Sequence, residues 1–227
     1  MNSAILPLFV AVPLLFAGGT ALLRGPLVQR TALLLASFLT LAGGVALLVF
    51  HQGTPVLAHS IGSYLPGVGI VFVSDSLSAL LLVVVAFLTM VSGIFLMLTG
   101  EDRYRFVVPL ILMLSTGVNG ALLTGDLFNM FVWVEVMLLP SYALVAVTGS
   151  WRRLGVGRMF VIVNIITSTI LVMGVGLLYG AYGSVNLAAL AGTGSNPQVS
   201  LATSLILFAL LVKAGVVPVH GWLPRAY

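Results

Sequence analysis

The sequence contains no cysteine and very few charged residues. Only 6% of its 227 residues are Asp, Glu, Lys or Arg, whereas soluble globular proteins carry about 25%. Without cysteine the chain can form no disulfide bond, no thiolate metal site and no cysteine nucleophile. Because so few charged side chains cannot coat a water-facing globule, the composition excludes a soluble domain.

The chain is instead rich in apolar residues. Hydrophobic residues make up 60% of it, and the mean hydropathy is +1.23. Apolar runs of about 20 residues, the length that crosses a bilayer, recur along the sequence. They predict an all-α polytopic membrane protein. The net charge of +4 does not indicate a nucleic-acid partner, because the arginines fall in short segments between the apolar runs.

About seven transmembrane helices are predicted. They cover approximately residues 4–23, 31–50, 77–98, 106–123, 127–147, 158–179 and 200–217. No Lys or Arg precedes the first run, so we interpret it as a retained helix and not as a signal peptide. Asp75 is typical of a helix N-cap, and Asp126 suits the positive end of the dipole of the helix that follows it.

The connecting segments alternate in basic content. The positive-inside rule places arginine-rich segments in the cytoplasm and therefore the N-terminus outside. His51 and His59 then belong to an outer loop, where we expect them to be exposed to solvent. The arginines are Arg24, Arg30, Arg103, Arg105, Arg152, Arg153, Arg158 and Arg225.

One carboxylate, Glu135, interrupts the fifth apolar run. An ionisable group at membrane depth costs about 2.5 kcal/mol or more and is a functional-site candidate by default. The alternative is a carboxylate that is hydrogen-bonded to Ser, Tyr or water inside the packed bundle. We interpret Glu135 as a group that exchanges protons or cations.

One lysine, Lys213, interrupts the seventh run in the same way. Gly215 and Pro218 follow it and predict that the helix breaks directly after the lysine. Broken helices at membrane depth usually line a cavity or an ion path. The alternative is a lysine whose amine extends to the interface. His220, just past the break, is a further candidate for proton transfer.

Other kinds of chemistry find no support in the sequence. It contains no glycine-rich nucleotide loop, no cluster with metal-ligand spacing and no Ser/His/Asp arrangement, so we predict no cofactor and no metal. Gly176 and Gly180 fit the spacing of a helix–helix contact between small residues. Tryptophans are common at membrane interfaces, which is how we interpret Trp133, Trp151 and Trp222.

Two segments resemble a known transporter family. The segment 125–144, which opens with Gly125-Asp126-Leu127-Phe128-Asn129 and contains Glu135, closely resembles the fifth helix of the D-type membrane subunits of Mrp-type multisubunit monovalent cation/proton antiporters. The segment 213–227 resembles the broken seventh helix of the wider superfamily, which includes the proton-pumping membrane subunits of respiratory complex I. The second motif is shared across the superfamily, so it is the first one that indicates the D type.

The resemblance implies a fold and a function. Residues 1–100 would form a three-helix N-terminal segment, and residues 101–227 an incomplete first five-helix repeat of a longer inverted-repeat fold, so we expect a fragment. Glu135 and Lys213 would form an ion pair that gates proton transfer in a Na⁺/H⁺ antiporter. Such a protein is a secondary transporter and not an enzyme. Its partners would be subunits of A, B, C, E, F and G type in the bacterial cytoplasmic membrane, with protons and Na⁺ as its cargo.

Two alternatives stay open at this stage. The chain could belong to a proton-pumping membrane subunit of a redox complex, either complex I-like or a membrane-bound hydrogenase. It could also be a truncated scaffold that does not transport ions.

Overall fold

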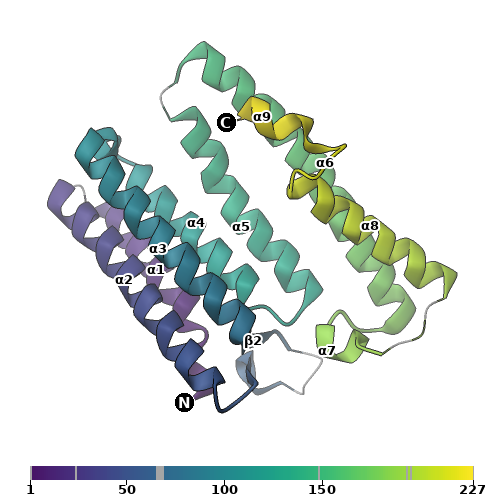
Figure 1. Ribbon diagram of the computed structural model, residues 1–227. Helices are drawn as coiled ribbons and strands as arrows, with labels where there is room; N and C mark the ends of the chain where they lie inside the picture. The colour runs from purple at the N-terminus through teal and green to yellow at the C-terminus, as the bar shows by residue number, and fades with distance from the viewer. Residues whose placement is uncertain are drawn as a thin grey trace.

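The computed structural model describes residues 2–23, 25–64, 69–147, 149–192, 194 and 196–226, and most of them are helical (Figure 1). The long helices are α1 (Leu8–Leu22), α2 (Pro26–His51), α3 (Ser76–Thr99), α4 (Val107–Leu122), α5 (Leu127–Ala146), α6 (Trp151–Tyr182) and α8 (Pro197–Lys213). The short elements are η1 (Ser3–Ile5), β1 (Val56–Ser60), η2 (Ile61–Ser63), β2 (Val71–Asp75), η3 (Glu101–Arg103), α7 (Leu187–Leu190), η4 (His220–Trp222) and α9 (Leu223–Ala226).

The seven predicted helices are present. Within the described ranges, five helical segments are long and apolar enough to cross a membrane, and the shorter apolar helices α4 and α8 complete the set. The all-α polytopic fold class is therefore confirmed. The predicted start of α6 was wrong by about two turns, because the helix begins at Trp151 and not near residue 158. Ser150 caps this helix by accepting a hydrogen bond from the backbone N–H of Arg153, so the arginine segment belongs to the helix.

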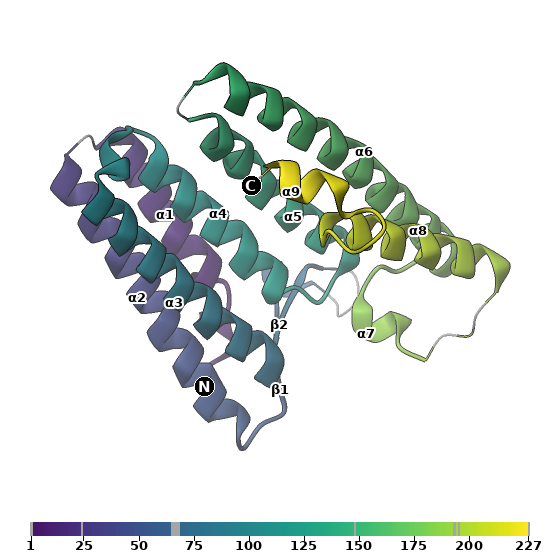
Figure 2. The ribbon, with the colours of Figure 1, turned by 45° about the horizontal axis from the view of Figure 1, so that its top comes forward.

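The helices form two groups that meet between α4 and α5. Figures 1 and 2 show α1–α4 on one side of the molecule and α5, α6 and α8 on the other. Small residues allow the closest approaches. A Cβ on Gly117 would lie 2.6 Å from the backbone nitrogen of Met137, and a Cβ on Gly174 would lie 2.8 Å from Ile206 Cγ1. The contact predicted for Gly176 and Gly180 is not made among the described residues, because a Cβ at either would meet no described atom within 4 Å.

A short β-hairpin, which the sequence did not predict, fixes the start of α5. Strands β1 and β2 pair antiparallel, with Val56 opposite Asp75. The turn before α5 continues this pairing, because Gly125 donates its N–H to the carbonyl of Val71 at 2.9 Å. On its other side the same turn accepts a 2.9 Å bond from the N–H of Leu187 in α7. Figure 1 shows the hairpin and α7 at the same end of the bundle.

The two histidines of this end are not solvent-exposed as predicted. His51 is buried, because the hairpin folds back over the end of α2. Its Nδ1 lies 2.8 Å from the carbonyl of Thr54 and its Nε2 lies 2.9 Å from Ser74 Oγ. A carbonyl can only accept, so Nδ1 carries a proton. His59 is half-buried, and its Nδ1 lies 3.2 Å from Ser3 Oγ.

Asp75 caps α3, as predicted. Its carboxylate accepts a 2.7 Å bond from the N–H of Ser78, and Ser78 Oγ accepts a 2.8 Å bond from the N–H of Asp75. The backbone hydrogen bond from Ser78 is the main reason that the pKa of Asp75 lies below its ordinary value of 3.8. This pair of reciprocal bonds fixes the last residue of β2 against the first turn of α3.

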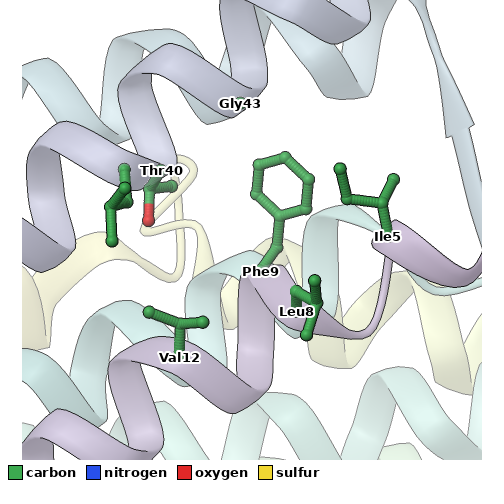
Figure 3. Close-up of a pocket in the computed structure, with 7 residues that line it drawn as sticks. Ile5, Leu8, Phe9, Val12, Thr40 and Gly43 are labelled. Atoms are coloured by element: carbon green, nitrogen blue, oxygen red, sulfur yellow. The ribbon is translucent and has the colours of Figure 1, made fainter. Parts of the chain in front are cut away.

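A small apolar groove lies between α1 and α2 (Figure 3). Its volume is about 220 Å³, and the one hydroxyl among its lining residues, on Thr40, donates to the carbonyl of Ala36 in its own helix. The groove therefore offers no free polar side chain for chemistry. Its lining residues are Ile5, Leu8, Phe9, Val12, Leu39, Thr40 and Gly43.

A proline inside α1 creates a bond between two helices. Pro13 has no N–H, so the carbonyl of Phe9, four residues earlier, has no donor within α1. Asn119 of α4 is fully buried and donates its side-chain N–H to that carbonyl at 2.9 Å. The amide thus replaces the missing helical bond and ties α1 to α4.

We predict that Asn119→Leu destabilises the protein by about 1–2 kcal/mol, since the carbonyl of Phe9 then has no partner in an apolar bundle. Thermal unfolding of the purified complete protein in detergent measures this. Thr116→Val is the matched control, because the Thr116 hydroxyl donates only to Leu112 in its own helix. Equal losses of stability in the two variants would contradict the assigned role of Asn119.

Candidate functional site

The start of α5 determines where Glu135 lies. Asp126 caps the helix by accepting a 2.8 Å bond from the N–H of Asn129, which confirms its interpretation as a helix-terminal acid. The Asn129 side chain in turn donates to Thr124 Oγ1 at 2.9 Å. This anchored start places Glu135 in the middle of α5, with 34% of its side chain exposed.

The seventh transmembrane helix, α8, ends at Lys213, and the break expected near Pro218 is confirmed. Gly215 is the immediate cause. It has a left-handed φ of +65°, donates its N–H to Val212 at 3.0 Å, and lets Val216 donate to Leu211 at 3.1 Å. This pair of bonds is the Schellman ending, which glycine favours at this position. The helix therefore stops before the predicted end at residue 217, and Lys213 lies in its last turn.

The segment after the break folds back towards α8 and α6. The indole N–H of Trp222 donates to the carbonyl of Val212 at 2.8 Å. Its ring stacks on Phe160 with centroids 5.4 Å apart, and Phe160 meets Tyr142 edge-on at 5.3 Å. Trp222 is thus half-buried and packs against other side chains of the molecule, and its interpretation as an interface anchor stays a prediction.

The other two tryptophans differ from each other. Trp133 is half-buried and lies against Phe72, with ring centroids 6.4 Å apart, so it also packs inside. Trp151 is 91% exposed at the start of α6, as an interface anchor would be.

Three helices bring their polar side chains together at the break. Lys213 Nζ of α8 lies 3.8 Å from Glu135 Oε1 of α5. Ser168 of α6 lies between them: its Oγ accepts a 2.8 Å bond from Lys213 Nζ and donates to Glu135 Oε1. The Lys213 side chain is 11% exposed and Ser168 is 7% exposed. The structure thus joins the two residues predicted from the sequence through one that was missed.

The signal that could have found Ser168 was a cluster of polar residues in the apolar helix α6. The cluster comprises Asn164, Thr167, Ser168 and Thr169. Neighbouring hydroxyls on a helix point in different directions, so the sequence could not say which of them faces the charged pair. The structure does: the Thr167 and Thr169 hydroxyls donate to carbonyls one turn earlier in α6, whereas Ser168 reaches α5 and α8.

His220 lies past the break, in η4, and is half-buried. In the described part of the chain its buried Nδ1 has no hydrogen-bond partner. This nitrogen therefore takes no part in the contact between Glu135 and Lys213, and a role for His220 in proton transfer stays a prediction. The described residues also contain no group of three or more His, Cys, Asp or Glu side chains that could hold a metal ion.

The arrangement allows one kind of chemistry. The Lys213 ammonium can only donate hydrogen bonds and an ionised Glu135 carboxylate can only accept them. Because the Ser168 hydroxyl bonds to both, the three groups form a continuous chain of hydrogen bonds along which protons can exchange. It lies beside a broken helix, where backbone groups need water or side chains as partners. Fold and site together define a polytopic membrane protein with a hydrogen-bonded lysine–serine–glutamate contact beside a broken helix.

Comparisons with known proteins identify similar membrane proteins. Residues 124–227 match the family described as NADH:quinone oxidoreductase/Mrp antiporter, TM. The D subunit of the Na(+)/H(+) antiporter of Bacillus subtilis (strain 168) is 31% identical over an alignment of 233 positions, which includes 96% of this chain and 47% of that protein. The D subunit of the probable K(+)/H(+) antiporter of Rhizobium meliloti (strain 1021) is 37% identical over 175 residues, or 74% of this chain and 32% of that protein.

Solved structures show the same relationship. The Mrp complex from Dietzia sp. DQ12-45-1b has a chain with a TM-score of 0.95 and 46% identity, covering 99% of this chain and 43% of that one. The membrane-bound sulfane sulfur reductase, an archaeal respiratory membrane complex, gives a TM-score of 0.87 and 27% identity, covering 98% and 47%. Over residues 124–227 this chain matches the NADH:quinone oxidoreductase/Mrp antiporter family, and over nearly its whole length it resembles the D subunit of a Na(+)/H(+) antiporter and a chain of an Mrp complex. It spans less than half the length of these relatives.

We predict that Gly215→Ala weakens the break, at a cost of about 1 kcal/mol, because alanine disfavours a left-handed φ. The new Cβ would also lie 2.9 Å from Leu223 Cδ2. Hydrogen exchange at the amide of Val216 should become about fivefold faster. Gly221→Ala is the control, since a Cβ there meets no described atom within 4 Å. Equal exchange in both variants would show that Gly215 does not hold the break.

Proposed function

We propose that this chain is part of a membrane subunit of a multisubunit Na⁺/H⁺ antiporter and carries proton translocation through Glu135 and Lys213. The observation that carries the proposal is their 3.8 Å approach inside the bundle, directly at the end of a broken helix. The names of the similar D subunits support the choice of antiport. No bond in a substrate is made or broken, so the protein is a transporter and not an enzyme.

The pair would work as an electrostatic gate. Opposite charges about 4 Å apart attract by about 4 kcal/mol at the effective dielectric of a protein. Opening the pair therefore needs a compensating charge, which a proton or Na⁺ on the Glu135 carboxylate would supply. Once Glu135 is neutralised, the attraction between the two groups is lost and the pair can open.

The arginines support an orientation. Figure 1 shows the starts of α2 and α6 at the end of the bundle that is opposite the hairpin. Arg30 lies near the start of α2 and forms a two-pronged ion pair with Asp102 of η3, at 2.5 and 3.1 Å, while Arg158 lies near the start of α6. By the positive-inside rule this end would face the cytoplasm and the N-terminus would lie outside, in the bacterial cytoplasmic membrane.

The remaining assignments rest on the resemblance to this family. Residues 1–100 would be the N-terminal three-helix segment and residues 101–227 part of the first repeat. Antiporter subunits of A, B, C, E, F and G type would be its partners. The glutamate–lysine pair and the break lie in the second of these parts, and so does the family match at residues 124–227.

A second candidate function is a proton-pumping subunit of a redox complex. The similarity in fold to the archaeal respiratory membrane complex favours it. The same charged pair would then be driven by electron transfer in partner subunits and not by a Na⁺ gradient. A scaffold that does not transport ions is the third candidate, and the pair would then be only a structural ion pair.

The test is Na⁺-dependent proton exchange in everted membrane vesicles that contain the complete complex. We predict that Glu135→Gln lowers exchange by at least about tenfold, because the amide cannot take up a proton or hold a cation. The complex should still assemble, as judged on a native gel. Glu101→Gln, a matched change in exposed η3, should leave exchange unchanged.

Three outcomes separate the candidates. Loss in the Glu135 variant alone supports the antiporter, and repeating the assay with K⁺ shows which cation is exchanged. Absence of exchange in the unaltered complex, together with proton pumping when a reductant is supplied, would favour the redox complex. Normal exchange with Glu135→Gln would make the carboxylate structural and overturn the proposal.

A further inference from the structure

The hydroxyl of Ser168 lies within hydrogen-bond distance of both charged groups, and no other polar side chain in the described ranges bonds to both. Nζ of Lys213 and Oε1 of Glu135 are 3.8 Å apart, beyond the roughly 2.7–3.2 Å of a direct hydrogen bond. Ser168 Oγ is hydrogen-bonded to both atoms. The acid and the base therefore meet through this hydroxyl and not directly.

The chemistry of the three groups fixes the direction of these bonds. The ammonium of Lys213 donates to Oγ, and Oγ donates its own proton to the carboxylate of Glu135. A serine hydroxyl has one proton and two lone pairs, so it can make both bonds at once. If both charged groups become neutral, the same chain can run in reverse, from the carboxylic acid through the hydroxyl to the amine.

Ser168 differs from the hydroxyls beside it. Serine and threonine inside a helix commonly donate to a carbonyl one turn earlier. Thr167 does so to Val163 at 2.6 Å, and Thr169 does so to Ile165 at 2.9 Å. Ser168 is 7% exposed and its proton goes to the Glu135 carboxylate instead.

The packing of α6 on α8 holds Ser168 in this place. The two helices share a buried cluster that includes Leu171 of α6 and Ala209 of α8, both fully buried. Ser168 precedes Leu171 by about one turn, and Lys213 follows Ala209 by about one turn. Because α6 and α8 run antiparallel, both positions lie in the same interface as this buried cluster. Helix packing, and not a mobile loop, therefore positions Ser168 against Lys213.

We propose that Ser168 relays a proton between Lys213 and Glu135. In one concerted step the ammonium gives a proton to Oγ while the hydroxyl gives its own proton to Oε1. One N–H bond and one O–H bond break, and two O–H bonds form. The products are a neutral amine, an intact hydroxyl and a carboxylic acid. The relay rests on the proposed function, because it supplies the step that neutralises the pair.

The test compares Ser168→Thr with Ser168→Val, which add nearly the same bulk and differ in the hydroxyl. Ser168→Ala removes the hydroxyl without adding bulk. All are made in the complete complex and assayed for Na⁺-dependent proton exchange in everted vesicles. We expect Thr to retain most of the activity and Val and Ala to lose about tenfold or more. Thr169→Val, on the exposed face of the same helix, should change nothing.

The outcomes divide cleanly for complexes that assemble normally. Rescue by threonine alone supports the relay, because a packing role would not distinguish threonine from valine. Activity within about twofold of normal for Ala or Val would overturn it, and so would equal loss for all three variants. Glu135→Gln in the same vesicles separates the two proposals: if it abolishes exchange while Ser168→Ala does not, only the relay is wrong.

Discussion

A lysine ammonium inside an apolar bundle is stable only beside an anion or hydrogen-bond acceptors, and the second half of this chain supplies both. Lys213 Nζ donates a hydrogen bond to the hydroxyl of Ser168 at 2.8 Å and lies 3.8 Å from the carboxylate of Glu135. Each partner comes from a different helix, so α5, α6 and α8 must hold a common register. The buried charges cost free energy unless they are paired, so the pair constrains the packing around it.

Different contacts set the position of each contributing helix. The turn before α5 is hydrogen-bonded between the hairpin and α7, which fixes the depth of Glu135. The buried interface between α6 and α8 holds Ser168 against the end of α8. Gly215 ends α8 directly after Lys213, and the indole of Trp222 then bonds the carbonyl of Val212 in the last turn of that helix. The charged pair is therefore held by bonds on both sides of the break.

The sequence predicted the features that depend on local composition. Apolar length marked the helices, and a lone charge in each of two apolar runs marked Glu135 and Lys213. Features that depend on distant partners were not predictable. The hairpin needs the turn before α5 to complete its pairing, and the burial of His51 follows from it. Ser168 looks like its neighbour Thr167 in the sequence, and only the packing of three helices distinguishes them.

The central claim is that Glu135 and Lys213 act as one unit. A double-mutant cycle of Na⁺-dependent proton exchange tests it most directly, with Glu135→Asp, Lys213→Arg and the double variant in the complete complex. Each single variant keeps its charge but alters the reach of the side chain, so residual exchange should be measurable. For a functional pair, the double variant should lose clearly less or clearly more than the product of the two single losses, by about threefold or more. Losses that simply multiply would contradict the claim, because they would mean that the two residues act independently.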